Sequence, residues 1–397
     1  MRLFELIKAE LKAVLSNPVI ALTVFGGVIF YSFLYPLPYA QQTPREQEIS
    51  VVNLDNSQTS RQLERMVDAT PQVKIVKRAH SINEAKAQLL QGDVSGILLI
   101  PEHFYRDLLL GKSPTLSYAG DASYFLVYGT IVEGLANAGG TLAAKAKVTR
   151  LIMDGVPLDT AKEQYAQVKL NMKPTFNPTL GYLSYVVPAV FVLILQQTLI
   201  MGVGILGCME KFIAGYWNKH TALTIITIRS LIFVAIYYLM AIYYFGFCFD
   251  FYGINKLASP LIILALLAPF LLCSTFIGIF LGALLPRREL VTFVVLISSM
   301  PLIFSAGFIW PLESVPLPMI WLSNLFPCTP AIQSFLAVNQ MGAEFSQILP
   351  QWQLLWLQVF IWGALAYVAY RRAQRIPVRF QAALKGRIKP LEKRNNS

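Results

Sequence analysis

Six long apolar blocks constrain the fold of this 397-residue chain more than any other feature of its sequence. The blocks cover residues 18–38, 180–207, 221–248, 257–285, 289–310 and 352–371. Each block is long enough for a helix to cross a hydrocarbon core of about 30 Å. Hydrocarbon offers the backbone no hydrogen-bond partner, so a helix, which satisfies its own backbone, is the expected structure. The sequence therefore predicts an α-helical integral membrane protein with six transmembrane helices.

A cleaved signal peptide is the alternative interpretation of residues 18–38. The apolar run is long for such a peptide, and Pro38-Tyr39-Ala40 is a poor cleavage site because it lacks the small-x-small pattern. We therefore interpret this block as an uncleaved transmembrane anchor.

The composition also favours a membrane protein, because 55% of the residues are hydrophobic and only 14% are charged. Soluble domains carry about 25% charged residues. The formal net charge of +11 would suit a nucleic-acid-binding protein. However, the basic residues crowd short segments beside the apolar blocks, which is the pattern of cytoplasmic loops in membrane proteins. We therefore expect the lipid bilayer, and no nucleic acid, as a partner.

Residues 39–178 differ from the rest, since they hold most of the acidic residues and alternate between strand-like and helix-like patterns. Strands are predicted at 49–55, 73–79, 95–101 and 115–122, and helices at 60–70, 82–92 and through most of 123–170. Alternating β and α units indicate a small α/β domain. This domain is inserted between the first and second spans.

The first 17 residues have an amphipathic pattern, in which Leu3, Ile7, Leu11 and Val14 share one helical face. Such a helix can rest in the membrane interface before the chain enters the bilayer. A plain polar flank would explain the segment equally well, and the sequence leaves both interpretations open.

Arg and Lys cluster in four segments, which are residues 1–17, 208–220, 286–289 and the tail at 372–397. Six alternating spans place these segments on one side, and the positive-inside rule makes that side cytoplasmic. Both termini are then cytoplasmic, and the α/β domain at 39–178 is extracytoplasmic. Residues 179–371 are expected to form a transmembrane domain with helices 2–6.

The sequence shows no catalytic constellation. Gly111-Lys112-Ser113 resembles the end of a phosphate-binding Walker A loop, but Arg106 occupies the position of the required earlier glycine. The three histidines are scattered, without the spacing of metal ligands. The four cysteines lie in or beside apolar segments, so they indicate neither a disulfide framework nor a zinc site. We therefore expect no catalytic residue, cofactor-binding residue or metal ligand on this chain.

Arg229, Gln196 and Gln197 are the polar residues inside the predicted spans that we consider as candidates for function. Arg229 lies about two turns into the third span, and a charge at a helix centre costs about 2.5–3.5 kcal/mol on insertion scales. We expect this arginine to snorkel to the inner membrane surface, with a buried functional ion pair as the alternative. Gln196 and Gln197 lie in the middle of the second span, where they would bridge helices at an interface or line a pathway.

Two short segments outside the spans are candidate functional sites. The 208–220 segment mixes aromatic and charged residues, which favours a docking surface for a soluble partner; its candidate residues are Glu210, Lys211, Phe212, Gly215, Tyr216 and Trp217. Residues 307–330 are rich in proline, which breaks helices, so they predict a broken hairpin at the outer mouth. Its candidate residues are Trp310, Pro311, Glu313, Pro316, Pro318, Pro327 and Pro330.

Three motifs resemble a known family. They are ISVVNLDNSQTSRQL and GDVSGILLIPEHFYRDLLLGKSPTLSYAGDAS in the α/β domain, and GFIWPLESVPLPMIWLSNLFPCTP between the last two spans. With the order of the spans, they resemble the type-2 ABC exporter permeases that have a large extracytoplasmic domain after the first transmembrane helix. The family's first cytoplasmic loop carries a Glu-x-x-x-Gly-Thr pattern followed by a proline. Here Glu210 and Gly215 stand one residue further apart, Tyr216 replaces the threonine, and no proline follows.

The resemblance implies a half-transporter in the bacterial inner membrane. Two permease subunits, identical or related, would enclose a pathway. Separate ABC ATPase subunits, which carry ATP and magnesium, would push on the 208–220 segment and on the amphipathic helix before the first span. A periplasmic membrane-fusion adaptor and an outer-membrane channel would complete the path of efflux.

The leading hypothesis is thus ATP-driven export of a drug-like or lipidic compound by a transporter subunit that is not itself an enzyme. A membrane-anchored ligand sensor and a non-transporting scaffold for envelope assembly are the alternatives.

Overall fold

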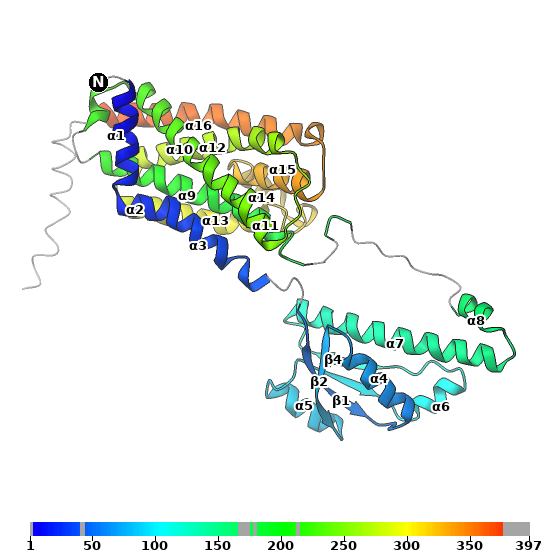
Figure 1. Ribbon diagram of the computed structural model, residues 1–397. Helices are drawn as coiled ribbons and strands as arrows, with labels where there is room; N and C mark the ends of the chain where they lie inside the picture. The colour runs from blue at the N-terminus through cyan, green and yellow to red at the C-terminus, as the bar shows by residue number, and fades with distance from the viewer. Residues whose placement is uncertain (1–2, 40–43, 166–174, 178–180, 212–214, 376–397) are drawn as a thin grey trace, which may run out of the picture. The chain divides into compact units, whose positions relative to one another are not determined.

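The computed structural model describes residues 3–39, 44–165, 175–177, 181–211 and 215–375. The chain divides into two compact units (Figure 1). Residues 1–40 and 181–397 form a helical unit, and residues 41–180 form an α/β unit. Phe212 lies outside the described residues, as does the tail after Arg375.

Six helices within the described residues are long and apolar enough to span a membrane. They are Pro18–Tyr39, Val186–Glu210, Ala222–Tyr252, Pro260–Leu284, Arg288–Ser305 and Phe345–Arg375. The first comprises α2 (Pro18–Ala21), a π-helical turn and α3 (Gly27–Leu34), and the third comprises α10 (Ala222–Ile242), a π-helical turn and α11 (Phe249–Tyr252). The others are α9 (Val186–Glu210), α12 (Pro260–Leu284), α13 (Arg288–Ser305) and α16 (Leu349–Arg375). The prediction of a helical membrane protein with an α/β insert is confirmed.

Helix α9 is the centre of the helical unit. In its most apolar stretch 94% of the residues are buried, against 22% in the first and last spans. Glycines let α12 approach it closely, because a β-carbon on Gly282 would lie 2.8 Å from the carbonyl oxygen of Gly204. The same β-carbon would lie 3.2 Å from the α-carbon of Gly207. These backbone contacts explain why small residues occur at this helix crossing.

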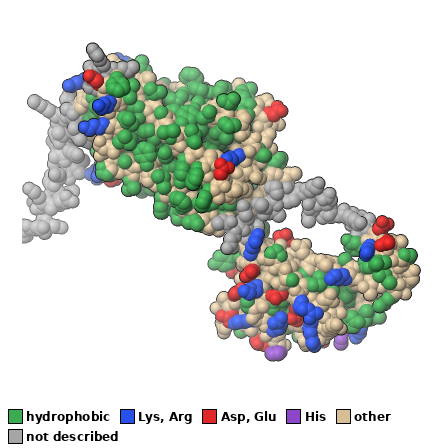
Figure 2. Space-filling view, in the orientation of Figure 1, with side chains coloured by type: hydrophobic (Ala, Val, Ile, Leu, Met, Phe, Trp, Pro, Cys, Tyr) green, Lys and Arg blue, Asp and Glu red, His purple; other side chains and the backbone are tan. Residues whose placement is uncertain are grey.

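The outer helices carry large apolar side chains on their exposed faces, and Figure 2 shows these as a broad hydrophobic surface on the helical unit. Examples are Phe33 on α3, Phe304 on α13 and Phe360 on α16, with exposed fractions of 46%, 56% and 72%. A surface of this kind is suited to lipid or to another membrane subunit, and not to water.

The chain between α13 and α16 forms two short α-helices, with a 3-10 helix before them at Leu312–Ser314 and another after them at Phe345–Ile348. They are α14 (Leu317–Ser323) and α15 (Cys328–Gln340), and α15 packs against α9, α12 and α16. Sequence analysis predicted a broken hairpin here but missed α15, whose 13 residues are too few for a span. Of the hairpin residues, Trp310, Pro311, Glu313, Pro316 and Pro318 are exposed, while Pro327 and Pro330 are buried at the start of α15.

The α/β unit contains a four-stranded sheet in the order β2-β1-β3-β4. The strands are β1 (Gln47–Asn53), β2 (Val73–Ala79), β3 (Gly96–Ile100) and β4 (Ser117–Gly120). β1 pairs in parallel with β2 and β3, and β4 pairs antiparallel with β3. The helices are α4 (Gln58–Asp68), α5 (Ile82–Leu90), α6 (Phe104–Leu109), α7 (Phe125–Met153) and α8 (Leu158–Gln164).

Helices cover both faces of the sheet, as the alternation of side chains along β1 requires. Ile49 and Val51 point to one face, where they pack with α4 and α7. Val52 points to the other face and packs with Ala85 of α5. The predicted alternation of strands and helices is therefore confirmed.

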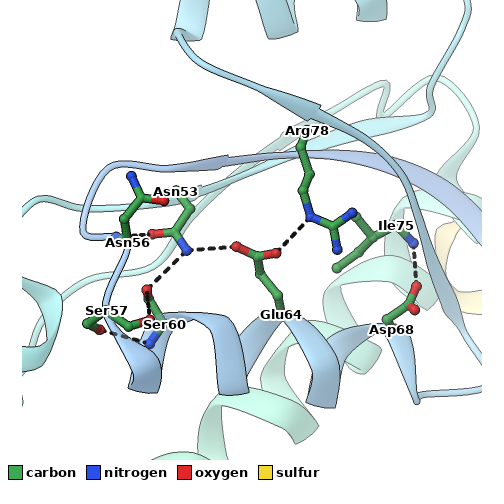
Figure 3. A network of polar contacts seen from close by, with 8 residues as sticks. All are labelled: Asn53, Asn56, Ser57, Ser60, Glu64, Asp68, Ile75 and Arg78. Carbon is green, nitrogen blue, oxygen red and sulfur yellow. Dashed lines mark hydrogen bonds and ion pairs between the residues drawn. The ribbon is translucent and has the colours of Figure 1, made fainter.

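A polar network fixes α4 to the ends of two strands (Figure 3). The Asn53 side-chain amide donates to Oε1 of Glu64 at 2.7 Å and to the hydroxyl of Ser60 at 3.0 Å. Arg78 of β2 donates from Nε to Oε2 of the same glutamate at 3.0 Å. Glu64 is only 7% exposed, so these contacts compensate the desolvation of its carboxylate.

Candidate functional site

Contacts between distant segments bring four parts of the chain together at one end of the helical unit. Lys211 Nζ donates to the carbonyl oxygen of Leu285, in the turn after α12, at 2.8 Å. Gln374 of α16 donates to the carbonyl oxygen of Trp217 at 2.9 Å. Helix α1 (Leu3–Leu15) packs against α10 at the same end. We call this the α1 end, and it unites the N-terminal helix, the 208–220 segment, the α12–α13 turn and the end of α16.

A buried group of charged and polar side chains lies at the α1 end. Arg229 of α10 is 0% exposed. It donates from Nε to Glu10 of α1 and from Nη2 to Glu210 at the end of α9. The Tyr216 hydroxyl donates to the second oxygen of Glu10, and the Tyr370 hydroxyl donates to the second oxygen of Glu210 at 3.3 Å. We call these five residues the Arg229 cluster.

The snorkelling interpretation of Arg229 is wrong. Its guanidinium is enclosed by protein and paired with two carboxylates that are 1% and 5% exposed. The Tyr370 ring also packs against it, with 5.8 Å between Cζ and the ring centroid. Desolvation of a charge is tolerated only with close partners of this kind, because removing one partner of a buried pair costs about 3–5 kcal/mol.

The cluster holds two carboxylates for one guanidinium, so the buried charges are compensated only if every hydrogen bond among them is kept. The two carboxylates accept four hydrogen bonds, and the donors lie in α10, in α16 and in the 3-10 helix of the 208–220 segment. Nη1 of Arg229 has no hydrogen-bond partner among the described residues. That nitrogen lies close to the α9–α12 crossing, 3.9 Å from the position of a β-carbon on Gly207. The arrangement ties α1, α9, α10 and α16 to one buried point.

Glu210 lies in a helix that is longer than the sequence predicts. The predicted second span ended at residue 207, and Glu210 belonged to the predicted docking segment that follows it. Helix α9 continues to Glu210, and the extra turn directs this side chain inward to Arg229. Lys211 is also partly buried, and burial lowers the pKa of its ammonium group below its ordinary value.

The described remainder of the 208–220 segment is a short 3-10 helix, Tyr216–Lys219, which Gly215 precedes in extended conformation. Tyr216 and Trp217 pack edge to face, with ring centroids 4.9 Å apart. Burial, and then the adjacent Glu10 carboxylate, raise the pKa of the Tyr216 hydroxyl well above its ordinary value. The hydroxyl therefore stays protonated at neutral pH and acts as the donor to Glu10.

Sequence reasoning missed Glu10 and Tyr370. It assigned Leu3, Ile7, Leu11 and Val14 to one face of the first helix, but Leu11 is exposed. Among the described side chains of α1, those of Leu6, Glu10 and Val14 are buried, and they follow one another at intervals of four residues. A carboxylate within this apolar stripe was the available signal, since buried glutamates are rare unless they are paired.

Gln196 and Gln197 of α9 differ in their surroundings. Gln196 is 3% exposed, and its Oε1 has no hydrogen-bond partner within the described part of the chain. Gln197 is half-buried. A role for either residue in a pathway or at an interface stays a prediction.

Comparison with known families identifies the class of protein that this architecture represents. The sequence profile described as ABC-2 family transporter protein matches residues 19–368. The chain therefore belongs to the ABC-2 transporter family, and it is a membrane permease subunit of an ABC transporter. The resemblance to type-2 ABC permeases is thus confirmed. No curated protein matches the sequence.

Membership of this family makes the chain a multi-pass transporter subunit rather than a catalytic one, and it implies association with ABC ATPase subunits. Within the described residues, no three His, Cys, Asp or Glu side chains come together as a metal site would require.

Proposed function

We propose that this chain is the permease subunit of an ATP-driven exporter that moves a drug-like or lipidic compound out of the cytoplasm or the inner leaflet. The family match over residues 19–368 carries this proposal. The broad apolar surface of the helical unit and its central helix α9 suit a pathway for compounds that enter from the membrane.

The ATPases are separate chains that bind at the α1 end, where they contact the 208–220 segment. ATP and magnesium bind to those chains, and this subunit supplies no cofactor site. The contacts of Glu10, Tyr216, Glu210 and Tyr370 support this assignment, because they join the 208–220 segment to spans on both sides of it. A displacement of the 208–220 segment by the ATPase can therefore be transmitted to α1, α9, α10 and α16.

The α1 end faces the cytoplasm in this proposal, so both termini are cytoplasmic and the α/β unit is extracytoplasmic. The location is the bacterial inner membrane. Two permease subunits, as a homodimer or a heterodimer, enclose the pathway, and a periplasmic adaptor with an outer-membrane channel extends it. The exposed apolar faces of α3, α13 and α16 support a second membrane subunit as one of the neighbours.

Affinity purification of the tagged full-length chain from its native membrane tests the proposal. We expect an ATPase with a P-loop to copurify, and we expect the pair, in inside-out vesicles, to accumulate lipophilic dyes when ATP is present. The matched control carries an alanine in place of the P-loop lysine of that ATPase. Copurification of a kinase would favour the ligand sensor, whereas envelope proteins without ATP-dependent transport would favour the assembly scaffold.

A further inference from the structure

We propose that Tyr216 transmits movement of the 208–220 segment to helix α1 through Glu10, with Arg229 as their common anchor. This inference rests on the proposed function, since it assigns residues to the coupling between ATPase and permease. Tyr216 and Glu10 act as positioning residues, because they set where α1 lies and contact neither ATP nor the transported compound.

The two oxygens of Glu10 bind partners from two different elements. One accepts a hydrogen bond from Tyr216, in the short 3-10 helix of the 208–220 segment. The other accepts from Arg229, inside α10. The backbone of Glu10 is part of α1, and its carboxylate connects this helix to the 208–220 segment and to α10. A displacement of Tyr216 must either carry Glu10 with it or break a hydrogen bond to a buried charge.

Arg229 is the fixed side of this arrangement. Its side chain is fully buried, and α10 packs against α9, α12 and α16. Its second contact, with Glu210, lies at the end of the central helix α9. Tyr216 is the side that can move, because it is half-buried and lies in a helix of four residues with exposed Asn218 and Lys219 beside it.

The chemistry of the hydrogen bond suits a permanent link. Hydrogen bonds to charged groups are worth about twice as much as neutral ones, particularly in a desolvated site. The phenol of Tyr216 also packs against Trp217, so the aromatic ring stays in place when the hydroxyl alone is removed. Tyr216→Phe is therefore the substitution that cuts the link and keeps the packing.

Tyr370 provides a comparison within the same cluster. Its hydroxyl donates to Glu210 at 3.3 Å, but it comes from α16 and has no part in the contact between α1 and the 208–220 segment. Tyr370→Phe removes the same atom from the same cluster. The proposal predicts that it leaves the distance between α1 and the segment unchanged.

The experiment measures distances between spin labels in the full complex with its ATPase. Labels are attached to Lys8→Cys on α1, Asn218→Cys in the segment and, as reference, Gln353→Cys in the first turns of α16, away from the contact of Gln374 with the segment. All three positions are exposed. The four native cysteines are buried, so the introduced ones react selectively. Pairwise distances are recorded without nucleotide and with a non-hydrolysable ATP analogue, and transport per ATP hydrolysed is measured in vesicles.

In the wild type we expect the labels at positions 8 and 218 to shift together relative to the label at position 353, with a narrow distribution of the distance between the first two. In Tyr216→Phe this distribution broadens, and the Lys8 label no longer follows Asn218. Transport per ATP falls about fivefold to tenfold, as expected for loss of a hydrogen bond to a buried charge. Glu10→Asp, which shortens the same link and keeps the charge, gives the same direction of change.

Tyr238→Phe is the control for activity, because it removes one hydroxyl donor, to the carbonyl oxygen of Leu264, from another part of α10. We expect wild-type coupling in this variant. A Tyr216→Phe protein whose label distances and coupling equal those of the wild type would overturn this inference alone. A wild type in which neither label responds to the ATP analogue would overturn the inference and the proposed function together.

Discussion

Arg229 of α10 forms an ion pair with Glu10 of α1, a residue 219 positions earlier in the chain. The pair is fully enclosed by protein, and a second carboxylate, Glu210, shares the same guanidinium. Buried ion pairs add little stability over apolar residues of equal size, yet they are strongly destabilising when one partner is lost. The cluster therefore constrains how α1 and α9 can be arranged more than it raises the free energy of unfolding.

This asymmetry leads to a prediction for Arg229. Arg229→Met leaves two carboxylates buried without a cation, and we expect it to destabilise the protein by about 3–5 kcal/mol. The triple variant Glu10→Gln, Glu210→Gln, Arg229→Met removes all three charges and should recover much of the loss. The midpoint of thermal unfolding in detergent checks both. A triple variant less stable than Arg229→Met alone would contradict this account of the cluster.

The α9–α12 crossing gives a prediction for Gly282. A β-carbon at this position would lie 2.8 Å from the carbonyl oxygen of Gly204, and backbone atoms cannot yield as a flexible side chain can. We expect Gly282→Ala to destabilise the helical unit by about 1–3 kcal/mol, the usual range for overpacking. Gly246→Ala is the matched control, because its β-carbon would meet only a methyl group of Ile242 at 3.9 Å.

Thermal unfolding of both glycine variants in detergent gives the comparison. Equal unfolding midpoints for Gly282→Ala and Gly246→Ala would show that α9 and α12 can move apart at this crossing without loss of stability.

Much of the fold was predictable because its determinants are local. The length and hydropathy of a block predict a spanning helix, and the alternation of strand and helix patterns predicts the α/β insert. Helix α15 was missed for the same reason, since a helix of 13 residues is too short to signal a span and becomes apparent only through its packing on α9.

The candidate site was harder to predict, because its geometry depends on where helices end and which helices meet. One further turn of α9 moves Glu210 from the predicted docking segment into contact with Arg229. Glu10, the partner of Arg229 on α1, lies 219 positions earlier in the sequence. Local patterns identified Arg229 and Tyr216 as residues of interest, but only the tertiary packing joins them through Glu10.

The α/β unit gives a prediction about pH. The ring of Tyr118 on β4 lies against Gly96 and Gly120, and its hydroxyl has no hydrogen-bond partner among the residues described. Burial, and then the neighbouring Tyr128, raise the pKa of Tyr118 to about 12. The ordinary pKa of tyrosine is about 10, so the unfolded chain loses this proton first as the pH rises. The contribution of Tyr118 to the free energy of unfolding is therefore fully present below about pH 10 and is lost progressively as the pH rises towards about 12.

Tyr118→Phe removes the titrating group and should weaken this alkaline loss, while leaving stability near pH 8 equal or slightly higher because a desolvated hydroxyl is gone. Hydrogen exchange of peptides from β3 and β4 in the full-length protein, compared at pH 8 and pH 11 after correction for intrinsic exchange rates, measures the effect. An equal loss of protection in both proteins at pH 11 would show that Tyr118 does not control it.

The proposed orientation in the membrane leads to the last prediction. Lys86 on α5 and Asn218 in the 208–220 segment are both exposed, and the native cysteines are buried. A membrane-impermeant maleimide should therefore label Lys86→Cys from the periplasmic side of intact spheroplasts and Asn218→Cys only in inside-out vesicles. This result is expected because, within the described residues, two spans separate the N-terminal helix from Asn218, whereas one span separates that helix from the α/β unit. If Lys86→Cys were labelled only in inside-out vesicles, the α/β unit would be cytoplasmic. The α1 end would then face away from the ATPases, which contradicts the proposed orientation.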